Sequence, residues 1–517
     1  MQEKVRRLFQ KPLVLFALAA VCLALPFHVS EFFFLTFVGA ALLFCGAKRV
    51  DLSTGLRGFF ALGFGFGFIY HLCIYHWLVA LHPLSAAGLG GIVSLLIVLL
   101  AYVGASAIHA LFFGAAFVLW GALCRVGRFR LFFFGVSLLL AEVLTSVGTL
   151  AFPWARFTLP LAAVAPLVSL ASVVGPLGCE ALLFAFGALT TRAAFGVRRT
   201  VSIVLAVFVL VLQAGFGILY CASPREGVVM KVAAVQTAYT SSEKWNVDRT
   251  ALLDYLRTSA LSAADEGAEV IVFPESVLAT RVVRGDANEA FFASLAEECD
   301  AVIAAGCIYY EDGKTYNATC LFDSEGLISY NAKRHLVPFG EYLPWQDVLS
   351  VVLPAVANMT FYRSSYTVGE TSLAGEAIGT TFGGLVCFDT LFSPLAAQSA
   401  KDGAHVLLAP TNDAWFKHTV AAREHLWHGT WRAVETGRAF VQSANTGISA
   451  VVDYDGTLLS EVPLGQEGVA FAEVELTDVV TPYVQTGDLV FPFCLLVVVA
   501  CGALALLRRL RGGAKGE

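Results

Sequence analysis

The sequence predicts a multispanning α-helical membrane domain of about eight spans joined to an outer α/β sandwich domain. Hydrophobic residues make up 57% of the 517 residues and charged residues only 14%, which is too apolar for an ordinary soluble protein. The apolar excess is confined to 1–221 and 487–507, whereas 222–486 has the composition of a globular domain. We therefore expect a seven-span domain at 1–221, an outer domain at 222–486, and a last span with a basic tail at 487–517.

Eight apolar stretches are candidate membrane spans, because each approaches the length needed to cross a bilayer as a helix. They lie near 12–27, 31–46, 56–79, 86–123, 130–147, 168–193, 201–220 and 490–507. The first stretch follows basic residues, as a signal peptide does. Six further spans precede the outer domain, which favours a retained first helix.

Basic residues in alternate loops predict the orientation. They are Lys4, Arg6, Arg7 and Lys11, then Lys48, Arg49 and Arg57, then Arg125, Arg128 and Arg130, then Arg192, Arg198 and Arg199, and finally Arg508, Arg509, Arg511 and Lys515. The intervening loops, such as 81–86, are nearly uncharged. The positive-inside rule then predicts cytoplasmic termini and places 222–486 outside, on the periplasmic side of a bacterial inner membrane.

Within 222–486, short apolar runs of strand character alternate with helical patterns. The expected strands are 231–237, 269–275, 301–310, 315–323, 327–335, 381–389, 405–410, 439–445, 447–456 and 468–476. The expected helices are 252–261, 287–298, 392–402 and 419–436. Strands that alternate with helices and hairpins predict a layered sandwich, in which helices cover two sheets.

The stretch 336–365 is apolar, but its prolines exclude one continuous helix. We interpret it as an arm that inserts apolar side chains into the outer leaflet. These side chains are Leu349, Val351, Val352 and Leu353. The alternative is a loop packed on the surface of its own domain.

Three chemically reactive residues each stand near the end of a strand-like run, namely Glu275, Lys333 and Cys387. A carboxylate that takes a thiol proton, a thiolate that attacks a carbonyl, and an ammonium that stabilises the oxyanion make an acyl-transfer site. Taken singly, each has a plainer interpretation: a paired carboxylate, a solvated lysine and a buried core thiol.

Charge and cysteine spacing exclude other classes. Acidic residues outnumber basic ones in the outer domain, which argues against a nucleic-acid partner. Its four cysteines, Cys299, Cys307, Cys320 and Cys387, lack the spacing of a zinc site, although a disulfide among the first three stays possible. The segment 423–432, rich in His, Trp and Arg, is interpreted as packing or contact with lipid headgroups.

The motifs NAKRHLVPFGEYLPW at 331–345 and FPES at 273–276, with the Cys387 run and FPW at 152–154, carry a family resemblance. The chain resembles, over essentially its whole length, the bacterial apolipoprotein N-acyltransferases, which join membrane spans to a nitrilase-type carbon–nitrogen hydrolase domain. The resemblance implies a nitrilase-like αββα sandwich. It also implies a triad with Glu275 as general base, Lys333 as oxyanion stabiliser and Cys387 as nucleophile.

Further site residues are implied by the same resemblance. Glu341 matches a second essential glutamate, and Asn317 and Trp245 match positions important for activity. Phe388 and Asp389 stand where the family frequently has tyrosine and glutamate, so Phe388 lacks a hydroxyl and Asp389 has a shorter arm. The backbone N–H of Phe388 is a candidate oxyanion donor.

The implied reaction moves an acyl chain from a membrane phospholipid, through a cysteine thioester, to the α-amino group of a diacylglyceryl-cysteine at a lipoprotein N-terminus. No cofactor and no metal are needed, and we expect a monomer. One alternative is a membrane-tethered nitrilase-type amidase that hydrolyses a small amide. Another is a transporter with an outer accessory domain, which predicts broken spans and repeats. Glu142 and Glu180 within the spans are functional or structural candidates.

Overall fold

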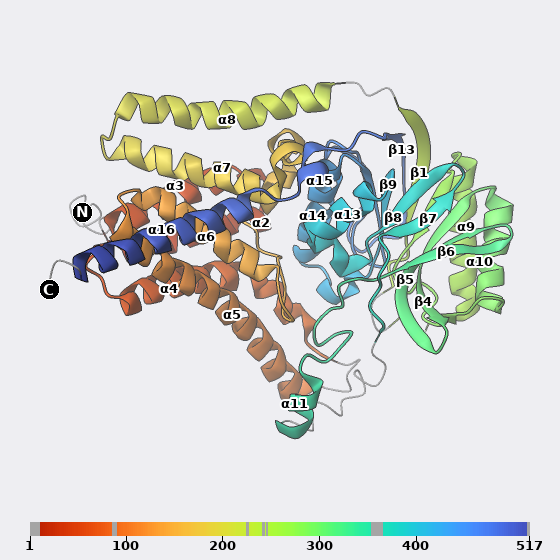
Figure 1. Cartoon of the computed structure of the whole chain (residues 1–517). Helices are drawn as coiled ribbons and strands as arrows, with labels where there is room; N and C mark the ends of the chain where they lie inside the picture. The colour runs from red at the N-terminus through yellow and green to blue at the C-terminus, as the bar shows by residue number, and fades with distance from the viewer. Residues whose placement is uncertain are drawn as a thin grey trace. The chain divides into compact units, whose positions relative to one another are not determined.

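The computed structural model describes residues 11–84, 90–223, 227–239, 243, 247–352 and 366–513. The chain forms two compact units (Figure 1). The first, the membrane unit, comprises Met1–His76, Leu99–Ile218 and Asp488–Glu517, and the second, the outer unit, comprises Trp77–Val98 and Leu219–Gly487.

The membrane unit is built of helices at the positions where apolar stretches predict spans. They are α2 (Pro12–His28), α3 (Leu35–Arg49), α4 (Leu56–Ile74), α5 (Gly91–Val126), α6 (Arg130–Thr145), α7 (Ala171–Ala194), α8 (Arg199–Ala222) and α16 (Val490–Gly513). The first turns of α5, up to Val98, belong to the outer unit. Short 3-10 turns connect some of them: η1 (Ser30–Phe32), η2 (Tyr75–Leu81), η4 (Leu159–Ala163) and η5 (Ala165–Leu167).

Five of these helices within the described residues are long and apolar enough to cross a membrane. They are α4 extended to Leu81, α5, α7, α8 and α16. Helices α2, α3 and α6 have 17, 15 and 16 residues, slightly short of the usual span length. A multispanning membrane protein is therefore confirmed, while the count of eight spans stays a prediction.

The outer unit contains two β-sheets (Figure 1). The first has the strand order β13-β1-β2-β4-β5-β6, with β3 beside β4, and the second has the order β12-β11-β10-β9-β8-β7. The strands are β1 (Val228–Gln236), β2 (Val270–Phe273), β3 (Arg281–Val282), β4 (Val302–Glu311), β5 (Lys314–Asp323), β6 (Gly326–Ala332), β7 (Leu373–Ala377), β8 (Thr380–Gly384), β9 (Val406–Thr411), β10 (Ala439–Ala444), β11 (Ser449–Val452), β12 (Leu458–Val462) and β13 (Gly468–Leu476).

The helices of this unit are α9 (Arg249–Asp265), α10 (Ala287–Cys299), α11 (Gln346–Val352), α13 (Ser393–Lys401), α14 (Ala421–Thr436) and α15 (Pro482–Thr486), with 3-10 turns η7 (Cys387–Leu391) and η8 (Asp413–Phe416). Alternate strand residues such as Val272 and Phe382 form a core between the sheets. The opposite faces pack on helices, with Phe292 of α10 on the first sheet and Leu426 of α14 on the second. This αββα layering confirms the predicted sandwich.

The strand predicted at 381–389 is partly wrong. β8 ends at Gly384, and Cys387 begins the 3-10 turn η7 with a φ of 49°. A residue in this left-handed region cannot continue a β-strand. The nucleophile candidate therefore lies beyond the strand, on a turn, and not at its last residue. The short strands β7 and β12 were not anticipated from the sequence.

Within the described residues 336–352, the predicted arm is irregular up to Trp345 and then forms the short helix α11. In α11 and just before it, Trp345, Val348 and Val351 are exposed by 54%, 59% and 80%. The side chains of Leu349 and Val352 and all of 353–365 lie outside the described residues. Whether the segment enters a membrane stays a prediction.

Candidate active site

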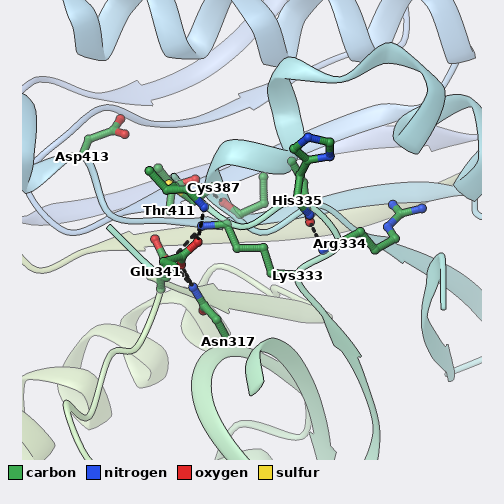
Figure 2. A network of polar contacts seen from close by, with 12 residues as sticks. Asn317, Lys333, Arg334, His335, Glu341, Cys387, Thr411 and Asp413 are labelled. Carbon is green, nitrogen blue, oxygen red and sulfur yellow. Dashed lines mark hydrogen bonds and ion pairs between the residues drawn. The ribbon is translucent and has the colours of Figure 1, made fainter. Parts of the chain in front are cut away.

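The structure brings the three reactive residues of the sequence analysis together in the outer unit, and Figure 2 shows Lys333 and Cys387 side by side. Glu275 follows the end of β2, Lys333 follows the end of β6, and Cys387 opens η7. The Nζ atom of Lys333 lies 3.6 Å from Oε1 of Glu275. Lys333 is 1% exposed and Glu275 is also buried, whereas Cys387 is partly exposed. A substrate that reaches the thiol therefore meets charges already shielded from water.

The backbone at Glu275 is held by close packing between strands. A Cβ atom at Gly306 in β4 would lie 2.4 Å from the Cα atom of Glu275, so this approach requires glycine. The N–H of Glu275 donates to the carbonyl of Thr411 at the end of β9, at 3.4 Å. The amide of Asn317, on β5, donates to the Glu275 carboxylate. Contacts from three strands thus orient this carboxylate.

Glu341 completes a buried network around the lysine. Its Oε1 accepts hydrogen bonds from Nζ of Lys333 at 2.9 Å and from Nδ2 of Asn317 at 2.8 Å, and its Oε2 accepts from the N–H of Val337 at 2.8 Å. Asn317 therefore bridges Glu275 and Glu341, while Lys333 lies between both carboxylates. Figure 2 shows Asn317, Lys333 and Glu341 converging. Of the supporting residues expected from the sequence, Glu341 and Asn317 lie in contact with Lys333 or Glu275.

The charges of the network set the protonation states. Burial lowers the pKa of Lys333, but Glu341 and Glu275 outweigh it, and the pKa is raised well above its ordinary value. Burial, followed by the charge of Glu275, raises the pKa of the Cys387 thiol, and Lys333 opposes this shift. The resting site therefore holds an ammonium and a neutral thiol. A thiolate forms only if a base such as Glu275 accepts the proton.

Asp389 lies beneath the loop that carries the lysine. It is fully buried, and its carboxylate accepts the backbone N–H groups of Arg334 at 3.1 Å and His335 at 2.7 Å. Burial raises its pKa to about 6, an effect that Arg334 and Lys333 oppose. Asp389 thus fixes the main chain after Lys333.

Two other residues implied by the family resemblance have different outcomes. The buried ring of Phe388 packs edge-to-face on Phe392, with 5.4 Å between ring centroids. This packing suits an aromatic ring without a hydroxyl. Trp245 lies outside the described residues.

Asp413 and His425 also belong to the site, and the sequence analysis did not select them. His425 Nδ1 lies 2.8 Å from Oδ1 of Asp413, and Nε2 lies 3.2 Å from the backbone carbonyl oxygen of Cys387. Both side chains are buried. The segment 423–432 was interpreted only as packing or headgroup contact. Asp413 could have been selected from the sequence, because it is an acidic residue soon after the end of an apolar strand, the same feature that selected Glu275.

Cys387, Asp413 and His425 also form a set of possible metal donors, because their ligand atoms lie within 4.8 Å of one another. A metal site needs a ring nitrogen with a free lone pair. Here both nitrogens of His425 face oxygen acceptors, a carboxylate and a carbonyl. The arrangement therefore fits an oriented histidine better than a metal ligand.

Comparison with known proteins agrees with both units of the chain. The family model for the apolipoprotein N-acyltransferase N-terminal domain matches residues 19–189, and the carbon-nitrogen hydrolase family model matches residues 231–481. Among solved structures, the chain is similar to Nit3 of Saccharomyces cerevisiae, a member of the nitrilase superfamily. The two are 21% identical, the match covers 52% of this chain and 98% of that chain, and the TM-score is 0.39.

Relatives named apolipoprotein N-acyltransferase align with most of the chain. The protein from Allorhizobium ampelinum is 31% identical, over 82% of this chain and 81% of the relative. The protein from Brucella melitensis is 32% identical over 72% of both chains, and that from Rhizobium etli is 30% identical over 87% of both. With the membrane helices, the αββα fold and these alignments, the chain belongs to the apolipoprotein N-acyltransferase family.

Proposed function

We propose that this protein transfers a fatty acyl chain from a membrane phospholipid to the α-amino group of the N-terminal diacylglyceryl-cysteine of apolipoproteins. The observation that carries the proposal is the cluster of buried Glu275 and Lys333 with the partly exposed Cys387 in a chain of this family. A thiol, a base and an ammonium suit acyl transfer. Apolar helices in the same chain suit a lipid donor.

In the first half-reaction, Glu275 accepts the thiol proton of Cys387, and the sulfur attacks an ester carbonyl of the phospholipid. The ammonium of Lys333 and the backbone N–H of Phe388 stabilise the oxyanion. When the tetrahedral intermediate collapses, the ester C–O bond breaks and the leaving alkoxide takes the proton from Glu275. The products are a Cys387 thioester and a lysophospholipid.

In the second half-reaction, the α-amino group of the acceptor attacks the thioester carbonyl, and Glu275 takes a proton from the amine. The C–S bond breaks, an amide forms, and the thiolate of Cys387 recovers its proton from Glu275. The acylated enzyme thus links two separate substrates in a ping-pong sequence. Glu341 and Asn317 hold Lys333 and Glu275 in place through both steps.

The orientation in the membrane is part of the proposal. Residues 1–221 and 487–517 form the bacterial inner-membrane domain with both termini in the cytoplasm, and 222–486 faces the periplasm. The alternating basic loops support this arrangement. The acyl donor and the lipidated acceptors then reach Cys387 from the outer leaflet.

The test is intact-protein mass spectrometry of the full-length protein and of Cys387→Ala, incubated with phospholipid and then with a diacylglyceryl-cysteine peptide. The expected result is a fatty-acyl adduct on the wild type alone, which the peptide amine discharges as an amide. Discharge to water alone, with the peptide unmodified, favours the nitrilase-type amidase or another hydrolase. Transfer by Cys387→Ala at the wild-type rate contradicts the proposed nucleophile.

The exposed α11 segment supports a role as the membrane-contacting arm. Val348→Glu together with Val351→Glu is expected to raise KM for vesicle phospholipid about 10-fold, because two exposed apolar side chains lose their contact with lipid. The matched control is Ser350→Asn on the same helix, which exchanges one polar side chain for another. An unchanged KM in the double variant contradicts the arm. The alkylation rate of Cys387 checks that the site itself is intact.

A further inference from the structure

The nucleophile candidate has an unfavourable backbone conformation. Cys387 has a φ of 49°, in the left-handed region that residues with a Cβ atom rarely adopt. Such a conformation costs on the order of 1–2 kcal/mol and persists only when neighbouring contacts hold it. In the active-site cluster, the direction of the Cys387 Sγ atom depends directly on this backbone. The contacts that hold it therefore bear on catalysis.

The carbonyl group of Cys387 is held by His425 from helix α14. Nε2 of His425 lies 3.2 Å from that oxygen, and Nδ1 lies 2.8 Å from Oδ1 of Asp413. A carbonyl and a carboxylate are both acceptors, so both contacts are hydrogen bonds only when both ring nitrogens carry a proton. With Asp413 ionised, the geometry therefore favours an imidazolium paired with a carboxylate.

The surroundings favour that charged form. Burial lowers the pKa of His425, but the Asp413 carboxylate and the Cys387 carbonyl outweigh it, with a smaller contribution from Glu275, and the pKa is raised. Burial raises the pKa of Asp413, and His425 opposes this. Phe416 presents its ring edge-on to His425, with 6.1 Å between centroids. Among the described residues, the groups that contact the imidazole include the Asp413 carboxylate, the Cys387 carbonyl and the Phe416 ring, and the charge of Glu275 acts on it as well.

The segment that carries Asp413 contacts the nucleophile a second time. The backbone N–H of Asn412 donates to the sulfur of Cys387. Gly447 leaves room for the Asp413 carboxylate, because a Cβ there would lie 2.5 Å from Oδ2 of Asp413. Consecutive residues after β9 thus fix the sulfur directly and the carbonyl through His425.

We propose that His425, held as an imidazolium by Asp413, is a positioning residue that fixes the backbone of Cys387 and so aims its sulfur at the acyl carbonyl. The proposal rests on the proposed function, in which Cys387 is the nucleophile. His425 touches neither the substrate nor the migrating proton; it acts through the main chain. Loss of its bond lets the left-handed Cys387 relax and turns Sγ away from Glu275 and Lys333.

The test compares His425→Leu, His425→Gln and Asp413→Asn in the full-length protein. A matched control is His428→Gln, which removes another buried histidine from the same helix. Acyl-enzyme formation from phospholipid is followed by intact-protein mass spectrometry. Alkylation of Cys387 by iodoacetamide, followed by peptide mass spectrometry, reports the thiol without any lipid. Thermal unfolding reports the stability of each variant.

His425→Leu is expected to lower kcat for acylation about 10- to 100-fold, the size of one hydrogen bond from a charged donor, with KM for phospholipid unchanged. His425→Gln is expected to recover part of the loss, because its amide N–H can donate to the same carbonyl. If the imidazolium is needed, the acylation rate is expected to fall when His425 loses its proton at high pH. Asp413→Asn is expected to move this fall to lower pH, because the imidazolium loses its carboxylate.

Three results overturn the inference. They are a kcat for His425→Leu equal to that of His428→Gln, no recovery in a His425→Gln protein as stable as the wild type, or an Asp413→Asn pH profile that matches the wild type. None of them challenges the proposed function, which fails instead if Cys387→Ala still transfers the acyl chain.

Discussion

Buried charges occur in both units of the molecule, but they are held in different ways. In the outer unit, Lys333 contacts two carboxylates, at 2.9 and 3.6 Å, and Glu341 accepts three hydrogen bonds. In the membrane unit, Glu180 is fully buried, yet neither of its oxygens accepts a hydrogen bond within the described residues. Its ion-pair partner Arg156 lies 3.9 Å away.

This difference teaches that burial of a charge does not by itself identify a catalytic group. A catalytic carboxylate must keep one orientation, and several hydrogen bonds are needed to fix the two oxygens. The network around Lys333 satisfies this condition. The Glu180–Arg156 pair lacks such hydrogen bonds to the carboxylate among the described residues, and the buried Glu142 lies on α6. This pair suits a structural link between α7 and the segment after α6 better than a catalytic role.

Lys333→Met is expected to have the largest effect. It leaves the buried carboxylate of Glu275 and the partly buried carboxylate of Glu341 without their cation, and removal of one partner of a buried ion pair costs about 3–5 kcal/mol. We expect acyl-enzyme formation below detection and a clearly lower melting temperature in detergent. Acylation at more than a tenth of the wild-type rate contradicts the assigned oxyanion role.

Glu341→Gln is expected to lower the acylation rate about 10- to 100-fold, because a charge-assisted hydrogen bond to Lys333 is replaced by a weaker neutral one. The side chain keeps its shape, so the melting temperature is expected to change by only a few degrees. Glu376→Gln is the matched control, since that glutamate is exposed on β7. Equal rates in the two variants disprove the supporting role.

Asp389→Asn is expected to change how stability depends on pH. The pKa of Asp389 is raised to about 6 from an ordinary value of 3.8, so the folded state binds a proton that the unfolded state has lost between these values. The contribution of Asp389 to the free energy of unfolding therefore falls as pH rises from about 4 to 6, by up to about 3 kcal/mol. The difference between the wild-type and variant unfolding profiles should show this fall. A difference independent of pH excludes this titration.

Glu180→Gln in the membrane unit is expected to have the smallest effect. Replacement of a buried charge that has only a long ion pair often has little effect on stability, so we expect the free energy of unfolding to change by less than about 1 kcal/mol. The acylation rate should stay within about two-fold of the wild type. A loss as large as that of Glu341→Gln removes the contrast between the two units and assigns Glu180 to the reaction.

The sequence predicted most elements because hydrophobic periodicity is a local property. The helices α9, α10, α13 and α14 lie where the apolar pattern indicates them. The strand expected at 381–389 was only half right, because β8 ends at Gly384 and the chain then turns into η7, where the left-handed Cys387 contacts His425, 38 residues further along the chain. Local propensity does not record such a distant contact.

The site shows the same division. Glu275, Lys333 and Cys387 are recognisable from strand-end positions and from a family resemblance, and that resemblance also indicates Glu341 and Asn317. The sequence does not reveal that Asn317 bridges two glutamates, since this depends on how β5 faces the loops after β2 and β6.

The sequence alone predicts apolar membrane helices joined to a layered α/β sandwich, because burial in lipid or in a core selects residue types position by position. Strand-end positions and the family resemblance add which residues are expected to carry the reactive groups. Only the tertiary structure decided that Asp413 and His425 belong beside Cys387. Hydrogen bonds depend on distance and direction, and folding sets both between residues that are far apart in the chain.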